Sequence, residues 1–389
     1  MSFYVIGMGV IVPLLVSLVL VAWIHPYIVR MALLKDIVDN PDARKLQKNP
    51  VPVLGGFAVY WGLVVGVGLT SMFFNSYALF TSIVAITVMM YVGILDDILG
   101  LSPTLRLVLE MAFIGFVIWM DQVSINNLHG LLGIYDIPLY WSVPICIFGG
   151  VGIINSINMI DGVDGLSSGF CVMACAIFGT AFFLSKDGTM TVLAALCLGS
   201  LLPFFFHNVF GQKSKMFIGD GGTLMMGMVM TIFVMHIIDR GSRVTYNFPN
   251  LGAIAFPLSV LSVPVFDTLR VMTGRIMKGI SPFHADKSHL HHLFIEMGFS
   301  HIGTTFCVLS LNFFNVLCWL ATYQLGGGAM YQLVVVVFVG FMITTGFYYV
   351  VRRLNHEHWP YKALKQMAKW SHVETGPMFY WVRRMVDKW

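Results

Sequence analysis

Long apolar segments follow one another along almost the whole chain, and they constrain its fold more than any other feature. A helix that crosses a membrane needs about 20 mostly apolar residues. About eleven such segments are present, at roughly 3–24, 53–74, 78–95, 105–120, 138–155, 166–184, 190–207, 223–238, 252–269, 304–321 and 329–350. The sequence therefore predicts an all-α, polytopic membrane protein with about 11 transmembrane helices.

The composition agrees with this prediction. Of the 389 residues, 57% are hydrophobic and only 11% are charged, whereas soluble domains carry about 25% charged residues. The high hydrophobicity excludes an intrinsically disordered chain, and the net charge of +4 gives no reason to expect a nucleic-acid partner. The six cysteines lie in apolar segments, so we expect small buried side chains rather than disulfides.

Basic residues are distributed unevenly between alternate loops. If the N-terminus lies outside, every Lys and Arg except Lys186, Arg240 and Arg243 falls in an inner loop or in the C-terminal tail. Cytoplasmic loops of membrane proteins carry an excess of Lys and Arg. We therefore expect the N-terminus outside and the tail in the cytoplasm.

We expect a single transmembrane domain over 1–350 and a cytoplasmic amphipathic tail over 351–389. Apolar residues of the tail fall on one helical face, at Met378, Val382, Met385, Val386 and Trp389. Such a stripe beside basic residues is typical of a helix that lies in the membrane interface. Packing of this helix against the protein's own loops is the alternative.

Acidic residues form glycine-rich clusters at the inner ends of the spans. The clusters lie at 93–97, 155–165 and 217–223. Ionisable groups at the edge of an apolar span are costly and are candidates for function. One cluster could serve as a helix cap, but three on the same side, with a histidine-rich loop, favour a shared functional site.

The residue types in these clusters indicate a kind of chemistry. Mg²⁺ takes one or two carboxylate or amide oxygens together with substrate phosphates. Glycine lets the backbone approach a phosphate, and basic side chains offset phosphoryl charge. The combination predicts Mg²⁺-dependent phosphoryl transfer on a membrane-borne substrate. The sequence contains neither a P-loop nor a kinase-type glycine-rich loop.

The loop at 281–292 contains His289, His291 and His292. Three histidines in four residues could bind zinc. Their spacing, however, directs neighbours to different faces, and no Cys or HExxH partner is present. Because Lys287 lies in the same loop, the binding of a diphosphate is the favoured interpretation.

These motifs resemble those of the polyprenyl-phosphate N-acetylhexosamine-1-phosphate transferases, and most closely the bacterial undecaprenyl-phosphate N-acetylglucosamine-1-phosphate transferase branch. The resemblance extends from about residue 35 to residue 300. The matching motifs are Asp39-x-Pro41 with Arg44-Lys45, Asp96-Asp97, Asn155-x-x-Asn158-x-x-Asp161-Gly162-x-Asp164-Gly165, Phe217-x-Gly219-Asp220 and His289-x-His291-His292.

The resemblance implies a reaction in which UDP-N-acetylglucosamine and a polyprenyl phosphate of the bilayer give polyprenyl-diphospho-N-acetylglucosamine and UMP. It implies Mg²⁺ as the cofactor, with Mn²⁺ as a substitute. It also implies a bacterial inner-membrane enzyme whose active site faces the cytoplasm and which makes the first lipid intermediate of a cell-surface polysaccharide. A homodimer is a further expectation.

The resemblance also assigns roles to residues. Asp220 and Asn158 would hold the metal ion, and Asp96 and Asp97 would be catalytic, one of them as the base. The implied substrate-binding residues are Asp39, Lys48, Arg106, Asn155, Asp161, Asp164, Phe217, His289, His291 and His292. Phe217 would stack on uracil, with Asp164 and Lys48 close to the base. The three histidines would bind the diphosphate or the sugar.

The motifs depart from the family pattern at three positions. Gln47 stands where relatives often have His, and Lys287 stands where they often have Arg, which loses bidentate geometry. Thr104 stands where relatives often have Lys, and we expect Arg106 to supply the lost charge.

Alternative functions stay open at this point. The donor could be another UDP-N-acetyl sugar or UDP-MurNAc-pentapeptide. From a different class, an ion-coupled transporter could use acidic clusters to line an ion path. Transporters usually place charges near the middle of the membrane and contain repeats, whereas the acids here lie at one face and no repeat is found.

Overall fold

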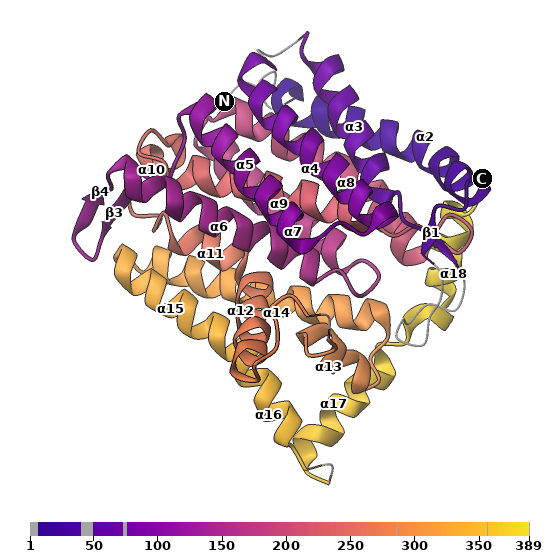
Figure 1. Cartoon of the computed structure of the whole chain (residues 1–389). Coiled ribbons are helices and arrows are strands. Elements are labelled where there is room, and N and C mark those ends of the chain that lie inside the picture. The colour runs from indigo at the N-terminus through magenta and orange to yellow at the C-terminus, as the bar shows by residue number, and fades with distance from the viewer. Residues whose placement is uncertain (1–6, 40–49, 73–75, 285, 356, 389) are drawn as a thin grey trace.

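The computed structural model describes residues 7–39, 50–72, 76–284, 286–355 and 357–388. Figure 1 shows a bundle of long helices, from which a pair of shorter helices projects near the C-terminal end of the chain. Strands are few and short. The all-α fold predicted from the sequence is confirmed.

Within the described residues, nine helices are long and apolar enough to cross a membrane. They are α2 (Val12–Leu34), preceded by the π-helical turn η1 (Gly7–Ile11); α4 (Phe80–Leu99); α5 (Pro103–Asp121); α6 (Leu139–Met159); α7 (Leu166–Leu184); α8 (Gly188–Phe210); α9 (Gly219–Ile238); α14 (His301–Gln324); and the continuous run of α15 (Ala329–Phe341), η3 (Met342–Gly346) and α16 (Phe347–Arg353). The chain is a polytopic membrane protein.

Two of the predicted spans take other forms, and α3 (Gly55–Thr70) is the first. It lies within the segment predicted at 53–74. With 16 residues it is apolar but shorter than the roughly 20 residues that a complete crossing needs.

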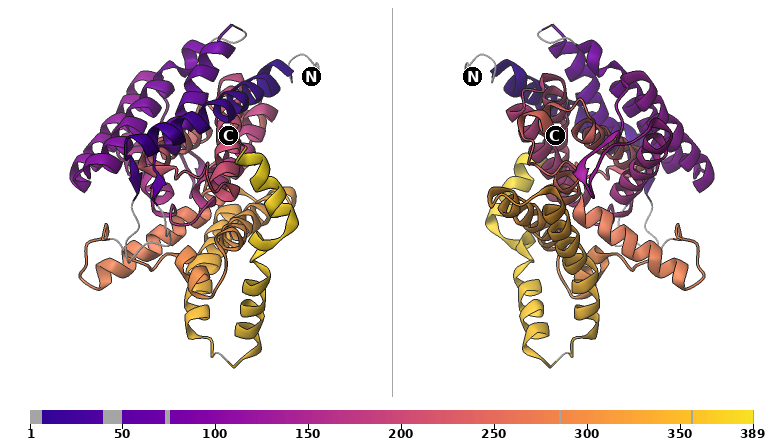
Figure 2. Two further views of the ribbon diagram at one scale, coloured as in Figure 1. Left: turned by 90° about the vertical axis from the view of Figure 1, so that its right-hand side faces the viewer. Right: turned by 90° about the vertical axis from the view of Figure 1, so that its left-hand side faces the viewer.

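The segment predicted at 252–269 is broken into α11 (Ala255–Val260) and α12 (Ser262–Met277). Pro264 explains the break, because proline has no N–H to donate and its ring clashes with the carbonyl four residues earlier. Helix α12 then extends beyond the predicted end of the span. Figure 2 shows α12 leaning out of the bundle, with the loop that follows it at its tip.

Short elements connect the long helices. Strand β1 pairs with β2 and strand β3 pairs with β4, and both pairs are antiparallel. The short elements are β1 (Val38–Asp39), β2 (Val51–Pro52), η2 (Ser76–Leu79), β3 (Asn127–Leu131), β4 (Ile134–Asp136), α10 (Arg243–Asn247), α13 (Leu290–Glu296), α17 (Trp359–Trp370), η4 (Val373–Thr375) and α18 (Pro377–Val386). The predicted tail thus contains α17 and α18, and α18 returns to contact α8.

The connecting loops gather at two ends of the bundle. At one end, Asn126 donates to a carboxylate oxygen of Asp239 at 2.8 Å, and Arg243 donates to the carbonyl of Lys186 at 2.8 Å. At the other end lie the C-terminal ends of α4 and α6 and the N-terminal end of α9, which carry the acidic clusters. This separation agrees with the alternation of loops on which the predicted orientation rests.

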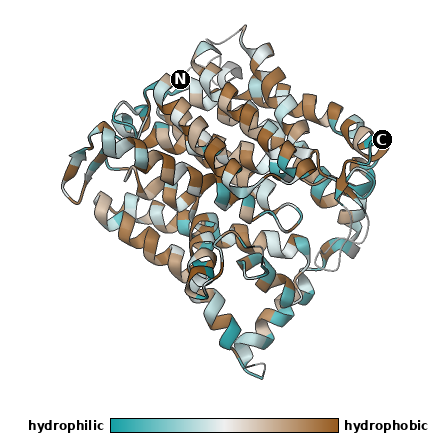
Figure 3. Ribbon diagram, viewed as in Figure 1, coloured by the Kyte–Doolittle hydropathy of each residue, from teal (hydrophilic) through white to brown (hydrophobic). Residues whose placement is uncertain are grey.

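Helix α9 forms the centre of the bundle. Nearly all of its side chains are buried, and it contacts α3, α4 and α6. Outer helices instead expose large apolar side chains, among them Trp23 of α2 and Phe338 of α15, and Figure 3 shows the apolar residues along these helices. An exposed apolar surface of this extent is suited to lipid.

The N-terminus of α9 lies directly against α3. Gly55 and Gly56 donate their backbone N–H groups to the carbonyls of Phe217 and Ile218, at 2.9 and 2.7 Å. A Cβ atom added to Gly56 would lie 2.2 Å from the backbone nitrogen of Gly222, which is far inside normal contact distance. Helices α3 and α9 can approach this closely only because Gly56 and Gly222 have no side chains.

Gly56→Ala should therefore lower the free energy of unfolding by about 1–3 kcal/mol, the usual cost of overpacking. The measurement is the apparent midpoint of thermal unfolding of the full-length protein in detergent. Gly68→Ala is the matched control on the same helix, because a Cβ atom there would have nothing within 4 Å. Equal midpoints for the two variants would contradict this account of the contact.

Candidate active site

A cavity of about 680 Å³ lies at the end of the bundle that carries the acidic clusters. This volume lies within the range of small-molecule binding sites. The predicted site residues that line the cavity are Asp39, Asp97, Asp161, Asp164, Phe217, Asp220 and His292. Segments that are distant in the sequence therefore contribute to one shared cavity.

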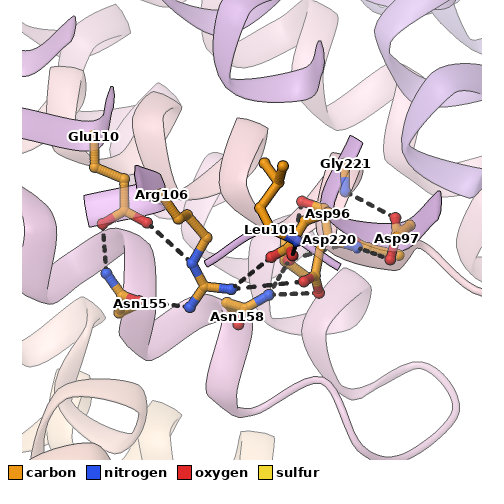
Figure 4. A network of polar contacts seen from close by, with 11 residues as sticks. Asp96, Asp97, Leu101, Arg106, Glu110, Asn155, Asn158, Asp220 and Gly221 are labelled. Carbon is orange, nitrogen blue, oxygen red and sulfur yellow. Dashed lines mark hydrogen bonds and ion pairs between the residues drawn. The ribbon is translucent and has the colours of Figure 1, made fainter. Parts of the chain in front are cut away.

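Arg106 of α5 lies beside two of the predicted acidic residues. Its Nη1 atom is 3.0 Å from Oδ2 of Asp96 and 3.6 Å from Oδ2 of Asp220, as Figure 4 shows. Two carboxylates this close repel each other, and the guanidinium that contacts both of them offsets their charge. Arg106, which we expected to supply the charge of the lysine that relatives often have at position 104, therefore contacts both of these acids.

Two residues fix this guanidinium from the other side. Glu110 is fully buried one turn further along α5, with Oε1 at 3.6 Å from Nε of Arg106. Asn155 donates to Oε2 of Glu110 at 2.6 Å and accepts from Nη2 of Arg106 at 3.0 Å. The predicted substrate-binding residue Asn155 therefore contacts Arg106 and is not among the residues that line the cavity.

Asp97 binds the N-terminus of α9. Its Oδ1 accepts the N–H of Asp220 at 3.0 Å, and its Oδ2 accepts the N–H of Gly221 at 3.2 Å. Gly219 has a φ of +68°, and an added Cβ atom there would lie 2.5 Å from Oδ2 of Asp97. An anion at a helix N-terminus is stabilised by the unpaired N–H groups. Asp97 therefore holds α9 in place as well as lining the cavity.

Asp220 lies beside Asn158. The Asn158 amide donates to Oδ1 of Asp220 at 2.8 Å and to the hydroxyl of Thr223 at 2.9 Å. Within the described residues, no three His, Cys, Asp or Glu side chains are grouped so as to hold a metal ion. The oxygens of Asp220, Asn158 and Asp96 nevertheless fit Mg²⁺, which commonly binds one or two carboxylates and completes its shell with phosphate and water.

The two acids of the middle cluster have different surroundings. Asp164 lies 2.6 Å from Nζ of Lys215 and 2.8 Å from Nδ1 of His301. Although burial alone would raise the pKa of Asp164, these partners hold it below its usual value. Asp161 is exposed to the cavity and accepts a hydrogen bond from Ser167. The protein atoms around its carboxyl group raise the pKa of Asp161.

Phe217 provides an aromatic ring in the wall of the cavity. Its backbone N–H donates to the carbonyl of Pro52 at 2.8 Å, and the Lys215 ammonium lies 5.9 Å from the centre of its ring. Such a ring can stack on a nucleotide base. Asp39 lines the cavity from β1, whereas Lys48 lies outside the described residues.

The three predicted histidines occupy different positions. His292 lines the cavity, whereas His289 and His291 are buried. Nδ1 of His289 is 2.9 Å from Oδ2 of Asp267. His291 fills the space beside Gly162, where an added Cβ atom would lie 2.4 Å from its Nε2. Burial lowers the pKa of both His291 and His292, which favours the neutral form of each imidazole.

Several residues of the site were not found by reasoning from the sequence. Glu110 is an isolated acidic residue within an apolar span. Its spacing of four residues from Arg106 is the sequence signal that could have identified it as a partner of that arginine. Lys215 and His301 approach Asp164 only through the fold. The tail also contributes to the cavity, through Glu374, Phe379 and Arg383.

Comparison with known proteins supports the resemblance stated above. Residues 79–238 match the profile of glycosyl transferase family 4. A probable undecaprenyl-phosphate N-acetylglucosaminyl 1-phosphate transferase of Bacillus subtilis is 28% identical over 81% of this chain and 87% of its own. The undecaprenyl-phosphate alpha-N-acetylglucosaminyl 1-phosphate transferases of Escherichia coli K12 and Yersinia pestis are each 26% identical. They cover 68% and 70% of this chain, and 70% and 73% of their own lengths. The resemblance indicated by the motifs is confirmed.

Asp164→Asn should lower the free energy of unfolding by about 1–3 kcal/mol at pH 7, because Lys215 and His301 lose their charged partner. The folded pKa of Asp164 is lowered, so its contribution to stability is complete above the unfolded value of about 3.9 and is lost as the pH falls through the folded pKa. The difference between wild type and variant should therefore shrink below about pH 4.

The measurement is the apparent midpoint of thermal unfolding between pH 7 and pH 3. Asp136→Asn is the control, since its ion pair with Arg240 is exposed and such pairs contribute about 0–1 kcal/mol. A difference between wild type and Asp164→Asn that stays constant down to pH 3 would contradict the assignment.

Proposed function

We propose that this chain, in which residues 79–238 match glycosyl transferase family 4, transfers N-acetylglucosamine 1-phosphate from UDP-N-acetylglucosamine to undecaprenyl phosphate. The products are UMP and undecaprenyl-diphospho-N-acetylglucosamine. The names of the relatives from Bacillus subtilis and Escherichia coli support the proposal. The structural observation that carries it is the meeting of the acidic clusters around one cavity, with Arg106 bound to Asp220 of its wall.

The two substrates create an electrostatic problem that the site is suited to solve. A phosphate monoester has its second pKa near 6, so the lipid phosphate is mostly a dianion at neutral pH. It must be brought against a diphosphate that is also anionic. Arg106, held by Glu110 and Asn155, offers a fixed positive charge near the place where these anions would meet.

We propose a single displacement. An oxygen of the lipid phosphate attacks the β-phosphorus of the UDP-sugar, the bond from that phosphorus to the bridging oxygen breaks, and UMP leaves with the bonding electrons. Most of the attacking phosphate is already deprotonated at neutral pH, so a base has little to do. Asp96 therefore acts mainly by positioning this phosphate. Both oxygens of Asp97 accept backbone N–H groups of α9, which suits a positioning role better than nucleophilic attack.

Mg²⁺ is the cofactor that we propose, with Mn²⁺ able to replace it. Asp220, Asn158 and Asp96 are the residues that would hold the ion. When bound, it would neutralise phosphate charge and orient the reacting groups. The fixed oxygens of these residues are near Arg106, so Arg106 and the cation would act on the same anions.

The remaining cavity residues suit the sugar nucleotide. Phe217 presents a ring on which uracil can stack. Asp164, with Lys215 beside it, can bind polar groups of the nucleoside, and neutral His292 can donate to the diphosphate or the sugar. These assignments add Lys215 to the substrate-binding residues predicted from the motifs.

We further propose that the protein lies in the bacterial inner membrane with this cavity facing the cytoplasm. If the loops alternate as the sequence predicts, the loops on the side of the cavity contain most of the Lys and Arg residues, as cytoplasmic loops do. UDP-sugars are soluble and anionic, so a cavity on that side would be open to the donor.

The function is tested with the purified full-length enzyme, undecaprenyl phosphate and a panel of UDP-sugars. UDP-N-acetylglucosamine should give UMP and a lipid-linked product in Mg²⁺, and EDTA should abolish both. UDP-N-acetylgalactosamine and UDP-MurNAc-pentapeptide should give less product. Asp220→Ala should reduce turnover by about 10²–10³-fold, whereas Asp136→Asn, at the opposite end, should retain it.

Each arm of this experiment can contradict one part of the proposal. A larger yield from another UDP-sugar would reassign the donor. Full turnover in EDTA would remove the metal ion from the mechanism. Full activity of Asp220→Ala in Mg²⁺ would remove Asp220 from the site.

The orientation is tested by labelling single introduced cysteines in intact cells with a membrane-impermeant reagent. Lys186→Cys should be labelled from outside, and Lys388→Cys only after the cells are permeabilised. Most native cysteines are buried, and the unsubstituted protein gives the background. Labelling of both positions from the outside would contradict the proposed topology.

A further inference from the structure

The last helix of the chain forms part of the cavity wall. Helix α18 lies against the C-terminal end of α8, where the ring of Phe379 is 5.1 Å from that of Phe210. Phe379 is 5% exposed. Phe379 and Arg383 line the same cavity as Asp220 and Phe217. A segment that follows the nine long apolar helices of the described residues therefore borders the candidate active site.

A single carboxylate fastens this helix to the bundle. Asp387 accepts hydrogen bonds from the backbone N–H groups of Gln212, Lys213 and Ser214 at 3.0, 3.1 and 3.0 Å. It also accepts one from the Ser214 hydroxyl at 2.8 Å. Successive N–H groups of this kind form a binding site for an anion. Although burial alone would raise the pKa of Asp387, these donors lower it.

The loop that receives Asp387 is itself anchored in the bundle. The hydroxyl of Ser214 lies 2.9 Å from Nδ1 of His207, and the carbonyl of Ser214 lies 2.9 Å from Nε2 of His25. The two imidazole rings are stacked with their centres 4.1 Å apart. Because α2, α8 and the tail meet at Ser214, α18 occupies a built site rather than an incidental surface.

The two faces of α18 have different surroundings. Phe379, Arg383 and Asp387, which are spaced four residues apart, contact α8 and the loop after it. Met378 and Met385 are exposed, as a face turned to a membrane interface would be. The contacts of the first face support packing of the tail against the rest of the protein, and an interfacial position of the second face stays a prediction.

Arg383 carries the positive charge of this wall. Its Nε donates to the carbonyl of Phe210 at 3.3 Å, and its guanidinium carbon lies 4.9 Å from the centre of the Phe379 ring. Among the described residues it forms no ion pair. The helix thus holds a guanidinium at the cavity with terminal N–H groups available for an anion.

We propose that Arg383 binds the nucleoside diphosphate of the sugar donor and that Asp387 is the positioning residue that seats it. The inference rests on the proposed function and adds the tail to the donor site. Arg383 lines the cavity together with Lys215, Asp164 and Phe217, the residues assigned to the sugar nucleotide. Asp96, which is assigned to the lipid phosphate, and its partner Arg106 lie on other helices, α4 and α5. The donor is therefore favoured over the lipid phosphate as the ligand of Arg383.

The test compares full-length Arg383→Gln with Arg384→Gln, its exposed neighbour. Steady-state kinetics vary UDP-N-acetylglucosamine and undecaprenyl phosphate separately, and calorimetry measures the binding of UDP alone. Arg383→Gln should raise the donor KM and the Kd for UDP by roughly 10- to 100-fold, as expected for a lost charged hydrogen bond. It should leave kcat and the acceptor KM within about twofold, and Arg384→Gln should match wild type. Arg383→Lys should restore part of the affinity.

Asp387→Asn tests the seating of the helix. It should raise the donor KM in the same direction and make α18 more sensitive to a protease added to the purified protein, with kcat retained. Asp387→Glu should restore part of the donor affinity.

The outcomes separate this inference from the function on which it rests. If wild type forms no product from any UDP-sugar, the proposed function fails. If wild type is active and Arg383→Gln matches Arg384→Gln in donor KM and in UDP binding, the inference alone is overturned. A rise confined to the acceptor KM also overturns it. A donor KM unchanged in Asp387→Asn would remove the positioning role.

Discussion

Several carboxylates lie close together at the N-terminus of α9, and the fold depends on offsetting their mutual repulsion. Arg106 bridges Asp96 and Asp220, and the backbone N–H groups that begin α9 take up the charge of Asp97. Both contacts use groups that the helices provide before any ligand binds. Placing acids at this point therefore costs less than burying them without partners.

The same contacts explain why the site is located at one end of the bundle. Helix α9 is almost entirely buried and so has a fixed position relative to its neighbours. Glycine contacts such as that of Gly56 with Gly222 bring α3 against its first turn. The polar groups of three clusters are thus held at the edge of the apolar region, where they meet around one cavity.

Apolar length and acidic clustering made much of this arrangement predictable from the sequence. The long helices follow directly from the solvent requirement of a membrane. The break before α12 follows from Pro264, although hydropathy alone predicted one continuous span. Local motifs could not reveal that His289 would pair with Asp267 or that His301 would reach Asp164, since such contacts depend on how distant helices pack.

The position of α18 makes part of the cavity wall depend on a segment outside the membrane-spanning helices. A polypeptide released about a dozen residues early would retain every helix long enough to enter the bilayer, yet it would lack Phe379, Arg383 and Asp387 from the wall. Loss of this segment would therefore leave those helices in place and remove one part of the cavity wall.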